Sequence, residues 1–105
     1  MPQFVLTYLG GDQPSSPEEG AQHMAKYRAW LTDLGEAAVS PMNPLKNMHT
    51  VNPDRDVTAG GTTSMSGYTI IAAESIEAAL AIAKECPFLD IGGSLEVSEL
   101  VQMQS

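Results

Sequence analysis

The segment from residue 3 to residue 9, QFVLTYL, constrains the fold more than any other part of the chain. In an extended strand successive side chains point to opposite faces, so Phe4 and Tyr8 lie on one face and Val5 and Leu9 on the other. A strand that is apolar on both faces is typical of a strand buried between two layers. The rest of the molecule therefore has to cover both faces of the sheet that contains this strand.

A helix is predicted after the loop that follows this strand. Ser16 can cap the free N–H groups of the first turn, and Pro17 fits the first helical position. Glu19 can reach back to the backbone N–H of Ser16 and complete a capping box. The helix should end at Leu34, with Gly35 in a left-handed conformation. It has an apolar stripe at the spacing of a buried helical face: Met24, Tyr27, Leu31 and Leu34.

The other elements are predicted from apolar runs, caps and breaks. Strands are expected at 37–40, 49–51, 67–73 and 94–103, the last with a bulge between Val97 and Leu100. A second helix follows Ser75, spans 76–85 and should bury Ile76, Ala79, Leu80 and Ala83. Residues 41–44, PMNP, are expected as a rigid extended connection and residues 52–64 as a mobile hairpin connection.

This order of elements predicts an α+β fold in one domain, residues 1–105. Two strand–helix–strand halves with right-handed crossovers give a ferredoxin-like βαββαβ sheet of four antiparallel strands, with both helices on one face. The second face has no cover within one copy. A second copy packing sheet to sheet supplies that cover, and the residues alone therefore predict a homodimer.

The charge and the cysteine content exclude several classes of partner. Thirteen acidic residues against five basic ones give a net charge of −8, and the basic residues are scattered, so neither nucleic acid nor a membrane surface is an expected partner. Cys86 is the single cysteine, which fits a reducing cytoplasm. Two histidines that are 26 residues apart make a weak metal signal, and no glycine motif predicts a cofactor.

Segments spread over almost the whole chain carry a resemblance to a known family. They are the glycines at 10–11, the segments 16–21 (SPEEGA), 23–27 (HMAKY), 29–31 (AWL) and 34–35, the residues Pro41 and 44–45, and the segments 66–68 (SGY), 77–93 and 96–97. These segments resemble the YCII-related (DGPF-like) family of small bacterial proteins. The resemblance implies a dimeric α+β barrel, in which two ferredoxin-like sheets face one another across a cleft.

The resemblance also implies a catalytic histidine on the first helix, with a carboxylate nearby, in those relatives that are enzymes. His23 falls close to that position. The segment 40–44, SPMNP, has no matching Asp, and the segment 58–66 lacks the Asp-Gly-Pro-Phe signature of one branch. Lys46 stands where a glycine is usual, and His49 stands where a basic residue is expected before Thr50.

His23 is the leading candidate for catalysis, because a half-buried histidine beside a cleft is suited to general acid–base work. Its alternative role is to cover the sheet edge. Tyr27 and Trp30 could line an apolar pocket beside it or serve as core or dimer contacts. Lys46 and His49 could bind an anionic group at the cleft mouth or be solvated loop residues.

Two functions from different classes follow. The chain is either a small enzyme of the lyase, isomerase or hydrolase kind with His23 as acid or base, or a non-catalytic ligand-binding, accessory or structural dimer. If the chain binds a small polar molecule, the cleft at the dimer interface is the expected place for it. The enzyme hypothesis predicts that His23 points into a pocket within reach of a polar group such as Ser66.

Overall fold

The structure, a computed structural model, describes residues 1–63 and 65–101. In chain order its elements are β1 (Gln3–Gly10), α1 (Pro17–Leu34), β2 (Ala38–Pro44), β3 (His49–Val51), β4 (Val57–Ala59), β5 (Met65–Ala72), α2 (Ile76–Ala83) and β6 (Gly93–Glu99). The turns Gly35–Ala37 and Pro87–Ile91 are short 3₁₀ segments. Within the described residues, neither helix is long and apolar enough to cross a bilayer.

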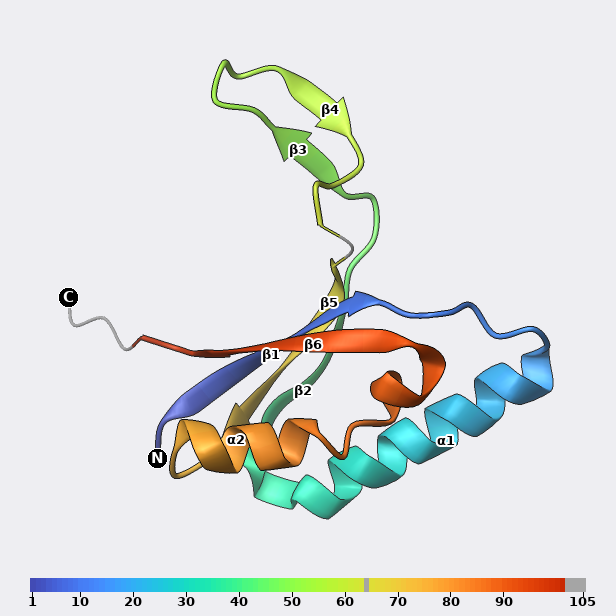
Figure 1. Ribbon diagram of the computed structural model, residues 1–105, viewed down its shortest axis with the longest axis vertical. Coiled ribbons are helices and arrows are strands. Elements are labelled where there is room, and N and C mark those ends of the chain that lie inside the picture. Colours follow the sequence, from blue (N-terminus) through green and yellow to red (C-terminus); the bar gives the residue numbers. More distant parts are fainter. Residues whose placement is uncertain (64, 102–105) are drawn as a thin grey trace.

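Four of the strands form one antiparallel sheet in the order β2-β5-β1-β6 (Figure 1). β1 lies inside the sheet, where Leu6 pairs with Thr69 of β5 on one side and with Val97 of β6 on the other. Both helices cover the same face of this sheet (Figure 1). The predicted α+β class and the ferredoxin-like order of strands and helices are therefore confirmed.

The two faces of the sheet differ in their cover. Phe4 and Leu6 are fully buried against the helices, whereas Val5, Leu9 and Ile70 on the opposite face are only half-buried. The residues of the hydrophobic core all lie on the helix-covered face or on the helices: Phe4, Leu6, Tyr8, Tyr27, Trp30, Ile71, Ala73, Ala79, Ala83 and Cys86. This open face, apolar at Val5, Leu9 and Ile70 and polar at Ser94, Glu96 and Ser98 of β6, is thus uncovered in the single copy.

α1 begins at Pro17 and ends at Leu34 as its sequence predicts, but Gly35 has a ψ of −126° and not that of a left-handed helical residue, and the capping box differs. The Ser16 hydroxyl accepts a hydrogen bond from the Glu19 N–H at 3.1 Å, and Gly35 ends the helix with a φ of 56°. The Glu19 carboxylate, however, accepts from the backbone N–H and the hydroxyl of Ser15, not from the N–H of Ser16. Ser15 offers two donors to one carboxylate oxygen, whereas Ser16 would offer only its N–H.

The segment 41–44, predicted as a connection, is part of β2, which is longer than the expected strand 37–40. β2 lies at the edge of the sheet, where a proline costs no ladder hydrogen bond, so Pro41 and Pro44 are tolerated. Its pairing with β5 shifts register between Ser40 and Asn43, which marks an irregularity around Pro41. The ladder then continues with the Leu45 N–H donating to the Ser66 carbonyl at 3.0 Å.

Residues 45–63, called the arm below, contain a two-stranded sheet of their own. β3 pairs only with β4 in the described sheets, with His49 opposite Ala59 and Val51 opposite Val57. The segment 49–51 is therefore a strand as predicted, but it is not an edge strand of the main sheet. Within 52–64 the residues 57–59 form a strand rather than a loop, and residue 64 lies outside the described residues. The arm projects away from the sheet and the helices (Figure 1).

Two predictions for the C-terminal half are wrong in detail. α2 buries Ala79 and Ala83 as expected, but Ile76 and Leu80 are 38% and 42% exposed, because the helix turns Ala78 and Ile82 toward the core instead.

The last strand ends at Glu99, and its pairing with β1 is regular from Gly93 to Glu99, so the predicted bulge is absent. The break in alternation before Leu100 marks the end of the strand. Residues 102 and 103 of the predicted strand lie outside the described residues.

Candidate functional site

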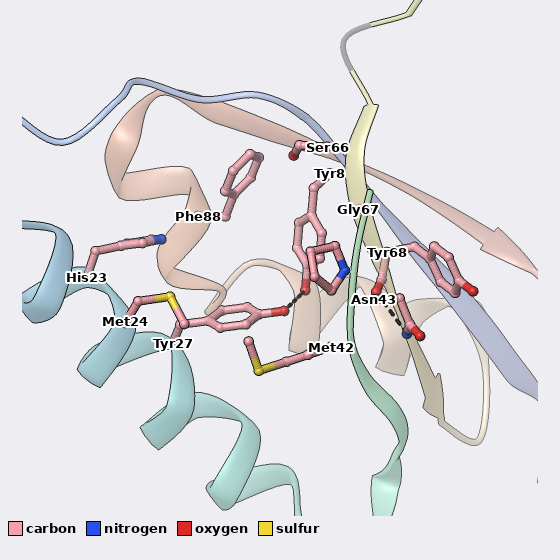
Figure 2. Close-up of a pocket in the computed structure, with 11 residues that line it drawn as sticks. Tyr8, His23, Met24, Tyr27, Met42, Asn43, Ser66, Gly67, Tyr68 and Phe88 are labelled. Atoms are coloured by element: carbon pink, nitrogen blue, oxygen red, sulfur yellow. Dashed lines mark hydrogen bonds between the residues drawn. The ribbon is translucent and has the colours of Figure 1, made fainter. Parts of the chain in front are cut away.

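A pocket of about 140 Å³ opens between α1, the ends of β2 and β5, and the turn Pro87–Ile91 (Figure 2). The residues that line it are mostly aromatic or apolar: Tyr8, His23, Met24, Tyr27, Met42, Asn43, Pro44, Ser66, Gly67, Tyr68 and Phe88. The described lining includes no Asp, Glu, Lys or Arg. A mainly apolar pocket with a few polar groups is typical of a small-molecule site.

Helical spacing brings His23 and Tyr27 to the same side of α1. They are four residues apart, and their rings stack with centroids 6.5 Å apart and planes 20° apart. His23 is half-buried at the rim of the pocket, and its ring points inward beneath Phe88 (Figure 2). Tyr27 reaches further in and is only 9% exposed. A titratable ring thus lies between solvent and an apolar interior.

The inner end of the pocket is a cluster of three hydroxyl groups. The hydroxyl oxygen of Tyr8 lies 2.7 Å from that of Tyr27 (Figure 2). It lies 2.5 Å from that of Thr69. The Thr69 hydroxyl donates to the Pro41 carbonyl at 2.7 Å. Burial raises the pKa of the Tyr8 hydroxyl above its ordinary value, so this phenol stays protonated. The cluster joins β1, α1, β2 and β5 through polar groups inside the core.

Asn43 fixes the outer wall of the pocket. Its side-chain amide donates to the Tyr68 carbonyl at 3.2 Å and to the Ser40 hydroxyl at 3.0 Å. These bonds hold β2 against β5 at the irregular part of their pairing, where ladder bonds are interrupted. The wall that carries Met42 is therefore attached to the sheet by a side chain.

Three of the residues singled out in the sequence, His23, Tyr27 and Ser66, line this pocket together. Trp30 does not line it. Trp30 is 8% exposed in the core, with its ring centroid 5.8 Å from that of Tyr27, and it borders a separate groove between α1 and α2. Trp30 and His23 are seven residues apart and therefore lie on nearly the same side of the helix. The same span separates them by about 10 Å along the helix axis, so Trp30 is too far along the helix to line the pocket with His23.

Lys46 and His49 also lie away from the pocket in a single copy. Both are exposed and belong to the arm, and the His49 Nδ1 bonds the Asn47 carbonyl at 2.8 Å. Among the described residues no group of three or more His, Cys, Asp or Glu side chains comes together.

Sequence reasoning missed Tyr8, Met42, Asn43 and Phe88 as pocket residues, and it missed Thr69 as a member of the hydroxyl cluster behind the pocket. Tyr8 and Thr69 did carry a signal, because each places a hydroxyl at a strand position whose neighbours two residues away, Leu6 and Ile71, are fully buried. A buried hydroxyl needs a hydrogen-bond partner, so two such positions predict a polar cluster inside the core. Met42 and Phe88 carried no comparable signal, since their place depends on how β2 and the turn Pro87–Ile91 pack.

Comparison with known proteins now adds to this geometry. The family model of the YCII-related domain matches residues 4–104, nearly the whole chain. The chain belongs to the YCII-related family. The resemblance inferred from the sequence is therefore confirmed. Among curated proteins, none matches this YCII-related chain.

One solved structure that the chain resembles is 5-chloro-2-hydroxyhydroquinone dehydrochlorinase from Burkholderia phenoliruptrix AC1100, in complex with 2,5-dihydroxybenzoquinone. The TM-score is 0.60 and the sequence identity 20%, and the match covers 96% of this chain and 95% of that one. At this level of identity the likeness shows that the two chains share a fold. For this YCII-related protein it supports the α+β architecture.

Proposed function

We propose that this YCII-related protein binds a small ring-bearing molecule in the pocket and that His23 moves a proton on or off the bound ring. The observation that carries this proposal is the convergence of His23, Tyr8 and Tyr27 on one pocket with aromatic walls. His23 supplies an imidazole that can accept or donate a proton, and the two tyrosines supply polar contacts.

The size and lining of the pocket support a ring as the ligand. An apolar cavity of about 150 Å³ holds a benzene molecule, and this pocket has about 140 Å³. Phe88 and Tyr27 offer ring faces and edges, and Met24 and Met42 offer thioethers that adapt to aromatic surfaces. A ligand expected from the sequence to be polar is thus better described as an aromatic or quinoid ring with polar substituents.

The charge of the site argues against a phosphate or carboxylate group on that ligand. The described lining has neither Lys nor Arg, and the whole chain carries a net charge of −8. Burying an anion without a cation or several donors is costly. Lys46 and His49, proposed from the sequence for such a group, contribute to this pocket only if a second copy brings its arm there.

The reaction proposed is proton abstraction from a hydroxylated ring, with loss of a leaving group in the lyase case. Removal of a hydroxyl proton by His23 lets its electron pair form a carbonyl, while the ring carbon that bears the chloride takes up a proton. Loss of a second hydroxyl proton then forms the second carbonyl and expels the chloride, so that HCl is lost overall. The solved relative is named as a dehydrochlorinase of such a ring and holds a hydroxylated quinone. That name supports the substrate class for this chain and does not establish it.

The test of binding uses hydroquinone as the probe and NMR of the two imidazole rings as the readout. The chain has two histidines, so each ring gives its own signals. We expect hydroquinone to shift the signals of His23 and leave those of His49 unchanged. His49→Gln should bind hydroquinone like the wild type, while Phe88→Ala should bind it more weakly. No shift at millimolar hydroquinone would contradict the proposal.

The test of catalysis measures chloride release from 5-chloro-2-hydroxyhydroquinone. We expect His23→Gln to lower kcat by about 100-fold or more, as loss of a general acid–base does, and His49→Gln to retain the wild-type rate. Binding without turnover in the wild type would leave the second candidate, a non-catalytic ligand-binding or accessory dimer. The half-buried open face of the sheet, described above, supports a dimer for this candidate as much as for the enzyme.

We propose further that two copies form a homodimer through the open face of the sheet, as the sequence predicted. The support is the row of half-buried apolar side chains on that face, Val5, Leu9 and Ile70. The proposed location is the cytoplasm, supported by the buried free thiol of Cys86.

A further inference from the structure

The hydroxyl cluster at the inner end of the pocket has as many protons as it has short contacts. Three oxygen–oxygen distances lie between 2.5 and 2.7 Å: Tyr27 to Tyr8, Tyr8 to Thr69, and Thr69 to the Pro41 carbonyl. Two oxygens at such a distance need a proton between them. The three hydroxyls have one proton each, so all three protons are used inside the cluster.

The direction of each bond follows from the carbonyl at one end. The Pro41 carbonyl can only accept, so Thr69 donates to it. The Thr69 oxygen must then accept from Tyr8, and the Tyr8 oxygen must accept from Tyr27. Tyr27 is the last member of this chain of bonds. Its oxygen keeps an acceptor position, and no proton of the cluster is left for a ligand.

Nothing in the described lining reverses the donor-to-acceptor direction of these hydrogen bonds. Burial keeps Tyr8 protonated, so the chain of donors is not broken by ionisation. Thr69 is fully buried behind Tyr8 and has no contact with the pocket itself. The Tyr27 oxygen also lies 3.1 Å from Thr69 and 3.4 Å from the Pro41 carbonyl, both on the inner side.

We infer that the inner end of the pocket accepts one hydrogen bond through the Tyr27 oxygen, and that it therefore binds a neutral ring hydroxyl more tightly than a carbonyl or a phenolate. Thr69 is the positioning residue that determines this preference. The inference rests on the proposed function, since it assumes that a ring binds in this pocket. A phenol can donate to the Tyr27 oxygen. A ring carbonyl or a phenolate would place two acceptors against one another there.

The test compares phenol, which can donate, with acetophenone, which can only accept. Their dissociation constants are measured by calorimetry or NMR on the wild type at pH 7. We expect phenol to bind about tenfold more tightly, because one hydrogen bond to a buried acceptor is gained and none is lost. Tyr27→Phe removes the acceptor oxygen and should bring the two constants close together.

Thr69→Val is the decisive variant, because valine keeps the shape and removes the acceptor for Tyr8. The Tyr8 proton can then turn to Tyr27, and the Tyr27 proton can turn to the ligand. The preference for phenol should fall at least tenfold, and Thr69→Ser, which keeps the hydroxyl, should restore it. Thermal unfolding of each variant confirms that it is folded before its constants are compared.

The outcomes separate the two proposals. If phenol and acetophenone bind the wild type equally, the selectivity inference is overturned while ring binding stands. An unchanged preference in folded Thr69→Val also overturns the inference. If neither compound binds at millimolar concentration, the proposed function falls and the inference with it.

Discussion

At the residue scale, the position of the Phe88 side chain depends on its neighbours Tyr8 and Gly93. Its ring packs edge-on against Tyr8, with centroids 5.1 Å apart, and it forms the roof of the pocket above His23 (Figure 2). The ring fits there because residue 93 has no side chain: a Cβ at Gly93 would lie 2.2 Å from the Phe88 ring. The shape of the pocket thus depends on a glycine outside it.

Gly93→Ala should therefore weaken both the fold and ligand binding. The added methyl forces the Phe88 ring away from Tyr8, and overpacking of this kind costs about 1–3 kcal/mol in the free energy of unfolding. Chemical denaturation measures that loss, and the affinity for hydroquinone should fall in parallel. Glu36→Ala, at an exposed position of the turn after α1, is the control. A wild-type affinity in Gly93→Ala would show that Phe88 does not shape the site.

Cys86 gives a prediction about pH. The thiol is 2% exposed, and burial raises its pKa to about 11 from an ordinary value near 9. Between these values the unfolded chain loses the thiol proton while the folded chain keeps it, so stability falls as pH rises. The free energy of unfolding should drop by about 1 kcal/mol between pH 7.5 and 9.5. Cys86→Ala should remove this drop; an equal drop in that variant would assign it to another group.

At the scale of the elements, the start of each helix could be predicted, because it is determined by hydrogen bonds between residues close in the sequence. Ser16 and Ser75 cap their helices through side-chain bonds to Glu19 and Ala78, at the positions expected from the sequence. The face of α2 was harder to predict, because eight mostly apolar residues offer several stripes and the contact with the sheet decides among them. β2 was underestimated, because its prolines indicate a connection unless the strand is known to lie at an edge.

Ser16→Ala tests how much the first helix depends on its cap. Loss of the bond to the Glu19 N–H should lower the free energy of unfolding by about 1 kcal/mol. α1 carries His23 and Tyr27, so its frayed first turns should also raise the rate of amide exchange near His23. Thr62→Ala, at an exposed position of the arm, also removes a hydroxyl and is the control; it should change stability by less than about 0.5 kcal/mol.

The candidate site shows where sequence-based prediction ended. His23 and Tyr27 could be paired in advance, since they are four residues apart on one helix. The members of the hydroxyl cluster could not be paired in advance, because they are separated by 19, 42 and 61 residues. They meet only through the register of β1 with β5. Tyr8 lies opposite Gly67 in that register, and a slip by one residue would turn it to the other face of the sheet.

At the scale of the whole molecule, two surfaces carry directly paired apolar side chains that other elements leave uncovered. One is the open face of the sheet, where Val5 and Ile70 are paired directly across β1 and β5. The other is the arm, where the paired residues Val51 and Val57 are 69% and 63% exposed. The open face is continuous with the sheet that supports the pocket, whereas the arm extends away from it (Figure 1). The proposed dimer, packed sheet to sheet, would therefore have its interface at the open face.

Ile70→Glu tests this assignment of the interface. Two packed sheets lie about 10 Å apart with their side chains interdigitated, so a carboxylate at this central position would be buried without a partner. Such a charge costs several kcal/mol, and the dimer dissociation constant should rise by about 100-fold or more. Light scattering coupled to size exclusion, over a range of micromolar concentrations, gives the mass of each variant. Val51→Glu introduces the same charge on the arm and should stay dimeric. If Val51→Glu dissociates and Ile70→Glu does not, the arm is the interface, and its Lys46 and His49 then become the residues that one copy brings to its partner.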